Sequence, residues 1–316
     1  MERTTSREST HTLTDPPDNN NNHLSHDNES LFSQDTLINP TITIMNQNIS
    51  NYTRIHSLPL VSNFLHTGVN LYKSWDDVVN NKDPILTRTS SKNIISSLIQ
   101  FKAMPFVTIY DSKKQEFCTV DFKIHSNHIT YYTLRFPSLD GFTLYLVNNN
   151  SSNPTVDFEY MGSLFRIRGV TGTTTMLGTS PEIKVYVMSP ESRENMLTFG
   201  VGDDERQLKR KLKIDNRLSR LIHNQDQRKI NDLLNNEKPL VNIPIARYFD
   251  QGDVKMKTGD GQKKKNVIKH GTIKIFDHGL TTTTTTENND VSDDMLVLCC
   301  VLLVLREQEY RKFKSS

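Results

Sequence analysis

Cysteine is scarce in this sequence of 316 residues, which contains three: Cys118, Cys299 and Cys300. An odd number of cysteines without regular spacing does not supply the paired framework of a small secreted domain. The first residues also lack the apolar stretch of a secretory signal peptide. We therefore expect a protein of the cytoplasm, a reducing compartment, in which the adjacent thiols act as small apolar side chains.

An excess of charge of one sign is also lacking. The 38 Lys and Arg residues nearly balance the 36 Asp and Glu residues, and the formal net charge is +2 at pH 7. A chain this close to neutral has no global electrostatic field that would steer it to a polyanion. The balance predicts no nucleic-acid partner, and contact with an anionic surface would have to come from local basic clusters.

The sequence contains no complete catalytic or metal-binding motif. His125 and His128 have a spacing that directs side chains to opposite faces of a strand, and no cysteine or carboxylate pair lies near them. His270 and His278 likewise lack partners in the sequence. Residues 259–265 contain no Ser or Thr after the lysine, which a phosphate-binding loop requires. We expect no enzymatic activity, no metal and no cofactor.

The beginning of the chain is poor in apolar residues. Asn, Ser, Thr and Asp dominate it, with a run of asparagines at residues 19–22. Such a segment buries too little apolar surface to offset the entropy of ordering it. Residues 1–62 are therefore predicted to form a disordered tail, and residues 63–316 a single domain with ample material for one core.

Alternating apolar and polar residues predict a mainly β domain. A helix is expected from an N-cap at Ser90 or Ser91 to the residue before Pro105, and Gly, Pro, Asn and Asp separate the alternating segments after it. Short strands at this spacing favour a closed or nearly closed antiparallel sheet. The expected strands are residues 106–110, 117–124, 128–136, 142–147, 156–160, 164–168, 183–188, 196–199, 242–249 and 267–276.

Three polar segments interrupt this pattern. Residues 205–238 predict one or two charged helices, residues 252–266 a loop, and residues 280–291, which contain a run of Thr, an insertion. The sheet should tolerate all three, because the cost of closing a loop grows slowly with its length.

One apolar run stands out, at residues 295–305. Ser292 is a suitable N-cap for a helix here, and Asp293 and Asp294 suit its dipole. The run has no polar face and would rise roughly 16 Å, whereas a bilayer core needs roughly 30 Å. It is therefore interpreted as a buried core helix instead of a membrane anchor. We expect a closed antiparallel β-barrel of about ten to twelve strands around it.

Local motifs add a family resemblance. Residues 158–168 contain aromatic residues around the turn at Gly162 and an aromatic-x-x-Arg pattern that ends at Arg168, and residues 271–275 precede the apolar helix. Together these features resemble the tubby C-terminal-like fold, which tubby, LURP-one-related and scramblase-like proteins share. The resemblance covers about residues 100–310 and implies a β-barrel around a central helix. The Asn-rich tail resembles those of budding-yeast proteins.

Basic residues cluster in two of the polar segments, on either side of the expected strand 242–249. We expect the two clusters to lie at the same end of the sheet and to bind anionic phospholipid headgroups, as tubby domains bind phosphoinositides. The residues assigned to this lipid site are Lys209, Arg210, Lys211, Lys213, Lys263, Lys264 and Lys265.

Other interpretations of the same features remain open. The basic clusters could be solvated loops or nuclear-import signals, and the chain could be a protein-interaction scaffold regulated through its Ser- and Thr-rich tail. Its location would then be the cytoplasm, the membrane surface or the nucleus. A monomer is expected.

Overall fold

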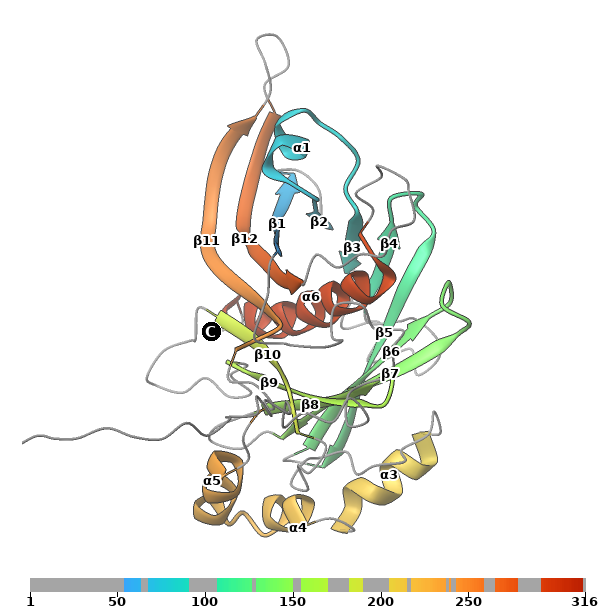
Figure 1. Cartoon of the computed structure of the whole chain (residues 1–316), viewed down its shortest axis with the longest axis vertical. Coiled ribbons are helices and arrows are strands. Elements are labelled where there is room, and N and C mark those ends of the chain that lie inside the picture. The colour runs from blue at the N-terminus through green and yellow to red at the C-terminus, as the bar shows by residue number, and fades with distance from the viewer. Residues whose placement is uncertain are drawn as a thin grey trace, which may run out of the picture. The chain divides into compact units, whose positions relative to one another are not determined.

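The computed structural model describes most of the chain after residue 53. The described residues are 54–63, 68–90, 107–126, 129–149, 155–169, 182–189, 205–214, 217–236, 239, 243–258, 265–277 and 291–314. They form twelve strands, which pair with their neighbours to make a closed barrel, and five helices. Figure 1 shows the strands around the C-terminal helix α6 (Asp293–Lys314).

Every neighbouring pair of strands is antiparallel, and β1 closes the barrel by pairing with both β12 and β2. This confirms the prediction of a closed antiparallel barrel. The strands are β1 (Arg54–Asn63), β2 (Gly68–Leu71), β3 (Leu86–Ser90), β4 (Val107–Asp111), β5 (Glu116–Ser126), β6 (Ile129–Phe136), β7 (Phe142–Asn149), β8 (Thr155–Tyr160), β9 (Ser163–Arg168), β10 (Glu182–Val187), β11 (Ala246–Thr258) and β12 (Lys265–Asp277).

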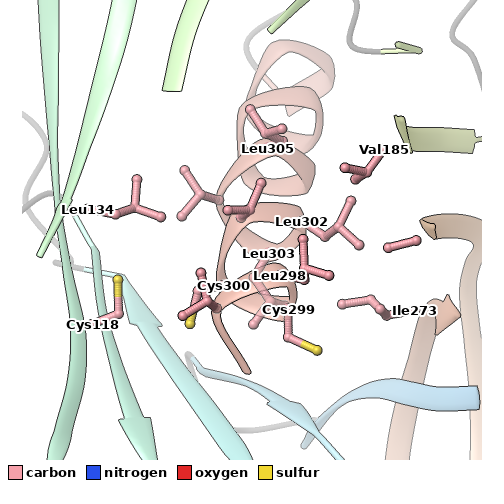
Figure 2. Packing of buried hydrophobic residues seen from close by; sticks show 14 of the residues in the cluster. Cys118, Leu134, Val185, Ile273, Leu298, Cys299, Cys300, Leu302, Leu303 and Leu305 are labelled. Atoms are coloured by element: carbon pink, nitrogen blue, oxygen red, sulfur yellow. The ribbon is translucent and has the colours of Figure 1, made fainter. Parts of the chain in front are cut away.

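The apolar part of α6 fills the centre of the barrel. Its side chains from Val297 to Leu305 are buried and join one core cluster with the inward-facing side chains of the strands. Figure 2 shows Leu134 on one side of the helix and Val185 on the other. The backbone N–H of Met295 donates to the Ser292 hydroxyl over 3.4 Å, so the predicted N-cap is present. The expectation of a helix enclosed by strands is therefore confirmed.

Three further helices cover part of the outer face. They are α3 (Glu205–Ile214), α4 (Arg217–His223) and α5 (Gln227–Asn236), where one or two were expected. Their apolar side chains pack against outward-facing residues of β6, β7 and β9. The residues of this second cluster include Ile129, Tyr131, Tyr145, Val147, Leu164, Leu208, Leu212, Leu218, Ile222, Ile230 and Leu234.

A third, smaller cluster lies under α1 (Trp75–Val79). Val78 packs there with Val61, Tyr72 and Val267, and the ring of Trp75 lies against the same group. Ser74 caps α1 by accepting a hydrogen bond from the backbone N–H of Asp77. The short helix thus covers the outer face of β1 and β12.

The barrel includes segments that the sequence did not predict as strands. β1 begins at Arg54, inside the expected tail, and β2 and β3 lie in a region without clear alternation. The segment 252–266, expected to be a loop, is largely strand, because β11 continues to Thr258 and β12 begins at Lys265. The expected strand 196–199, all of the expected helix after its cap, and nearly all of the insertion 280–291 lie outside the described residues.

The enclosed helix leads to a stability prediction. Leu302→Asp places a carboxylate in an apolar core without a partner, which costs several kcal/mol against a typical total of about 5–15 kcal/mol. We expect the variant to lose the cooperative unfolding transition in urea. Ile124→Asp is the matched control, because Ile124 is 72% exposed and should change the unfolding free energy by about 0.5 kcal/mol or less. A Leu302→Asp protein with a normal transition would contradict the enclosed position.

Candidate functional site

The basic residues predicted on the first polar segment lie on α3. Lys209 and Arg210 are exposed, whereas the side chains of Lys211 and Lys213 lie outside the described part of the structure. The Nζ of Lys209 lies 3.0 Å from Oε1 of Glu205, which also accepts a 2.8 Å hydrogen bond from the Tyr131 hydroxyl. This carboxylate partly neutralises the positive charge at the start of α3.

The second predicted group lies at the far end of the β11–β12 hairpin. Lys265 is the first residue of β12, opposite Thr258, and Lys263 and Lys264 fall outside the described residues. The pairs before it are Lys257 opposite Asn266, Met256 opposite Val267 and Lys255 opposite Ile268. Strand pairing thus continues through a segment in which the sequence predicted a loop.

A pocket lies at this hairpin end, with a volume of about 310 Å³. Its walls are Lys255, Met256, Lys257, Asn266 and Val267, a set that contains two lysines and no carboxylate. We define these five residues as the hairpin pocket. Such a lining favours an anionic group with an apolar part beside it, because the ammonium groups attract negative charge while Met256 and Val267 offer apolar surface.

Apolar and aromatic side chains border the hairpin pocket. Val254 is 46% exposed, and Met256 packs against the cluster that contains Trp75. The Nζ of Lys269 lies 5.2 Å from the centre of the Trp75 ring, in the position of a cation–π contact. The face of the hairpin opposite Lys255 and Lys257 therefore presents Lys269, a tryptophan and an aliphatic side chain together.

The two predicted basic groups do not meet. The helix α3 packs on the cluster formed with β6, β7 and β9, whereas the hairpin end packs on the cluster under α1. Figure 1 shows them at opposite ends of the barrel. The expectation that both groups lie at the same end of the sheet is wrong, because the sequence could not show that the chain between them crosses the length of the barrel.

Sequence reasoning also left Lys255 and Lys257 out of the candidate site. Both lie within residues 252–266, the segment that was interpreted as a loop. Read as strand, the alternation of Lys255, Met256 and Lys257 places the two lysines on one face and the methionine on the other. That alternation is the signal that could have found them.

A buried polar group lies where β12 passes the end of α6. His270 is buried; its Nδ1 lies 2.7 Å from Oδ1 of Asp253, and its Nε2 lies 2.8 Å from Oγ of Ser62. The sequence offered this histidine no partner for a metal site, and the structure shows that its two ring nitrogens have hydrogen-bond partners. Burial lowers the pKa of His270, and the positive charges of Arg306 and Arg88 lower it further, while Asp253 opposes them.

Other ionisable groups have structural roles. Arg166 and Asp157, directly opposite each other on β9 and β8, form a buried bidentate pair with N–O distances of 2.8 and 3.0 Å. At the other end of α6, the Tyr160 hydroxyl donates to Asp294 over 2.8 Å. Within the described ranges, no group of His, Cys, Asp and Glu residues could hold a metal ion.

No helix in the described part of the chain is long and apolar enough to cross a membrane. Comparison with known proteins adds no family, since no family model, no curated protein and no solved structure matches the chain. The tubby-like resemblance therefore stays a prediction. Function has to be inferred from the geometry of the barrel surface.

The environment of His270 predicts a pH dependence of stability. Because its pKa in the folded protein lies below the ordinary value of about 6.5, the folded state binds a proton less readily than the unfolded state. The stability linked to this group is complete above about pH 6.5 and is lost as the pH falls toward the folded-state pKa.

Urea unfolding at about pH 7.5 and about pH 5.5 measures this loss. The unfolding free energy should fall more between the two pH values in the natural protein than in His270→Gln, which cannot be protonated. An equal fall of the unfolding free energy in the two proteins would contradict the assignment of this pH dependence to His270.

Proposed function

We propose that this protein is a non-enzymatic binding protein that holds the headgroup of an anionic phospholipid in the hairpin pocket. The observation that carries the proposal is the lining of that pocket, in which Lys255 and Lys257 occur together with the apolar Met256 and Val267. A phosphoryl group carries negative charge and several acceptor oxygens, and lysine binds it as a compact point charge.

The surroundings of the pocket favour a lipid surface over a free phosphate. Lys265 adds a third cation at the same hairpin end. Each basic residue close to an anionic membrane contributes about 1 kcal/mol of attraction. The exposed Val254 and the amphipathic ring of Trp75 suit the boundary between headgroups and acyl chains.

The main lipid contact is therefore proposed at the hairpin and not on α3, where part of it was predicted from the sequence. On α3, Glu205 neutralises part of the charge of Lys209. The resemblance to tubby-like domains supports a phosphoinositide as the lipid. Lys209 and Arg210 are then a secondary contact, or solvated.

Co-sedimentation with liposomes tests the lipid proposal. We expect the protein to pellet with phosphoinositide-containing vesicles and not with neutral phosphatidylcholine vesicles. The double variant Lys255→Gln/Lys257→Gln should bind about 30-fold more weakly, which corresponds to about 1 kcal/mol for each lysine.

Two double variants serve as comparisons. Lys113→Gln/Lys229→Gln removes the same charge from exposed positions outside the hairpin and should leave the binding unchanged. Lys209→Gln/Arg210→Gln measures the contribution of α3. Equal pelleting on neutral and anionic vesicles would exclude the proposed headgroup site.

A second candidate function is a protein-interaction scaffold, and one observation favours it. Phe122 and Ile124 on β5 are 39% and 72% exposed, which is unusual for large apolar side chains so close together on one strand. If these residues contact a partner, Phe122→Ser/Ile124→Ser should lose a protein that co-purifies with the natural chain. Identical co-purifying proteins would remove this candidate.

A further inference from the structure

Four basic residues form a row across the outer face of the barrel. Arg168 on β9 lies directly opposite Lys184 on β10, Lys184 lies opposite Arg247 on β11, and Arg247 lies opposite Lys274 on β12. We call these four residues the basic row. Adjacent strands are about 4.8 Å apart, so the row spans three intervals, or about 14 Å.

All four side chains are on the outside of the barrel. Their neighbours along the strands, such as Ile167, Val185, Ala246 and Ile273, belong to the core around α6, and successive side chains of a strand point to opposite faces. The side chains of Lys184 and Arg247 are 39% and 33% exposed. A ligand in solution can therefore reach the row.

One acidic residue is shared among several of these cations. Lys184 Nζ lies 2.8 Å from Oε2 of Glu182, and Nη1 of Arg247 lies 3.9 Å from Oε1 of the same carboxylate. The hydrogen bond from Lys184 lowers the pKa of Glu182, and the charges of Lys184, Arg247 and Lys274 add to this effect. One carboxylate cannot neutralise three cations, and like charges directly opposite each other on a sheet are destabilising.

Aromatic rings position the two guanidinium groups of the row. The central carbon of the Arg168 guanidinium lies 5.5 Å from the centre of the Tyr186 ring, and that of Arg247 lies 5.5 Å from the centre of the Phe276 ring. A guanidinium that lies over a ring directs its N–H groups outward at its edge, which is the geometry for bidentate binding of phosphate.

The arrangement of charge defines the ligand. A single phosphate in contact with one member of the row can reach a neighbour, but it cannot span about 14 Å. A chain of linked phosphoryl groups can extend along the row, and it carries negative charge on every unit. We propose that the basic row is a second anion site, separate from the hairpin pocket, and that it binds a condensed phosphate chain. Free polyphosphate and the triphosphate of a nucleotide share this chemistry.

The row is less suited to single-stranded nucleic acid. Sequence-independent binding of such strands uses aromatic rings on which the bases stack. Arg168 covers one face of Tyr186, and Arg247 covers one face of Phe276. Phe249, two residues after Arg247 on β11, is 37% exposed and would offer a single ring for stacking. The observations therefore favour the phosphate chain.

Titration calorimetry with the full chain tests the proposal, with tripolyphosphate as the probe. Arg247→Gln/Lys274→Gln removes two cations and keeps the ion pair of Lys184 with Glu182, and it should weaken binding by about 10- to 100-fold. Arg135→Gln/Lys229→Gln removes the same charge from two other ion pairs and should change the affinity by less than about twofold. Equal affinities in the two double variants would overturn the site.

Glu182→Gln separates a binding role from a structural one. Removing the carboxylate that competes for the cations should tighten tripolyphosphate binding several-fold, an effect that partial unfolding cannot produce. Weaker binding in a folded Glu182→Gln protein would count against the row as an anion site.

Three other probes identify the ligand. Inorganic phosphate should bind at least about tenfold more weakly than tripolyphosphate, and equal binding would overturn the linear ligand. If ATP binds as tightly as tripolyphosphate, the triphosphate of a nucleotide can be the ligand of the basic row. If ATP binds much more weakly, the ligand is free polyphosphate. A single-stranded oligonucleotide that binds more tightly than a polyphosphate of similar charge would overturn the ligand class.

Discussion

The structure depends on the burial of one helix that has no polar face. The side chains from Val297 to Leu305 point in every direction around α6, so apolar material has to surround the helix on all sides. A closed barrel is the arrangement that meets this demand with strands, because it leaves no open edge and directs alternate side chains inward. The inward side chains of the twelve strands thus bury the helix, and the helix in turn fills the core of the barrel.

Because of this constraint, the strand positions that face the helix accept fewer residue types than the positions that face outward. Inward positions have to be apolar wherever α6 is apolar, and the polar group around His270, Ser62 and Arg306 lies where the apolar run of the helix ends. Outward positions can differ from place to place. Under α3, α4 and α5 they are apolar, on the stretch from β9 to β12 they include the basic row, and at the far end of β11 and β12 they include Met256 and Val267 of the hairpin pocket. The basic row is therefore a property of the outer face.

The fold was more predictable than the site. The alternation in residues 117–124 and 142–147 identified strands, and the length of the apolar run identified an enclosed helix. β1 was missed because it follows a polar tail without a break in composition, and the continuation of β11 was missed because its exposed lysines resemble those of a loop. The lipid site predicted from charge runs on α3 and the hairpin divided into two distant surfaces. Basic residues close in sequence were counted together although the barrel separates them.

The sequence by itself determined the composition of the two faces and the need to enclose the terminal helix, because both follow from local periodicity and length. Tertiary structure alone decided which residues stand opposite one another. Arg168, Lys184, Arg247 and Lys274 lie on four separate strands, and they become a row through the register of three strand pairs. Register depends on the packing of whole strands around the barrel, and a shift of one residue would turn each of these side chains toward the core. No pattern within a single strand contains that information.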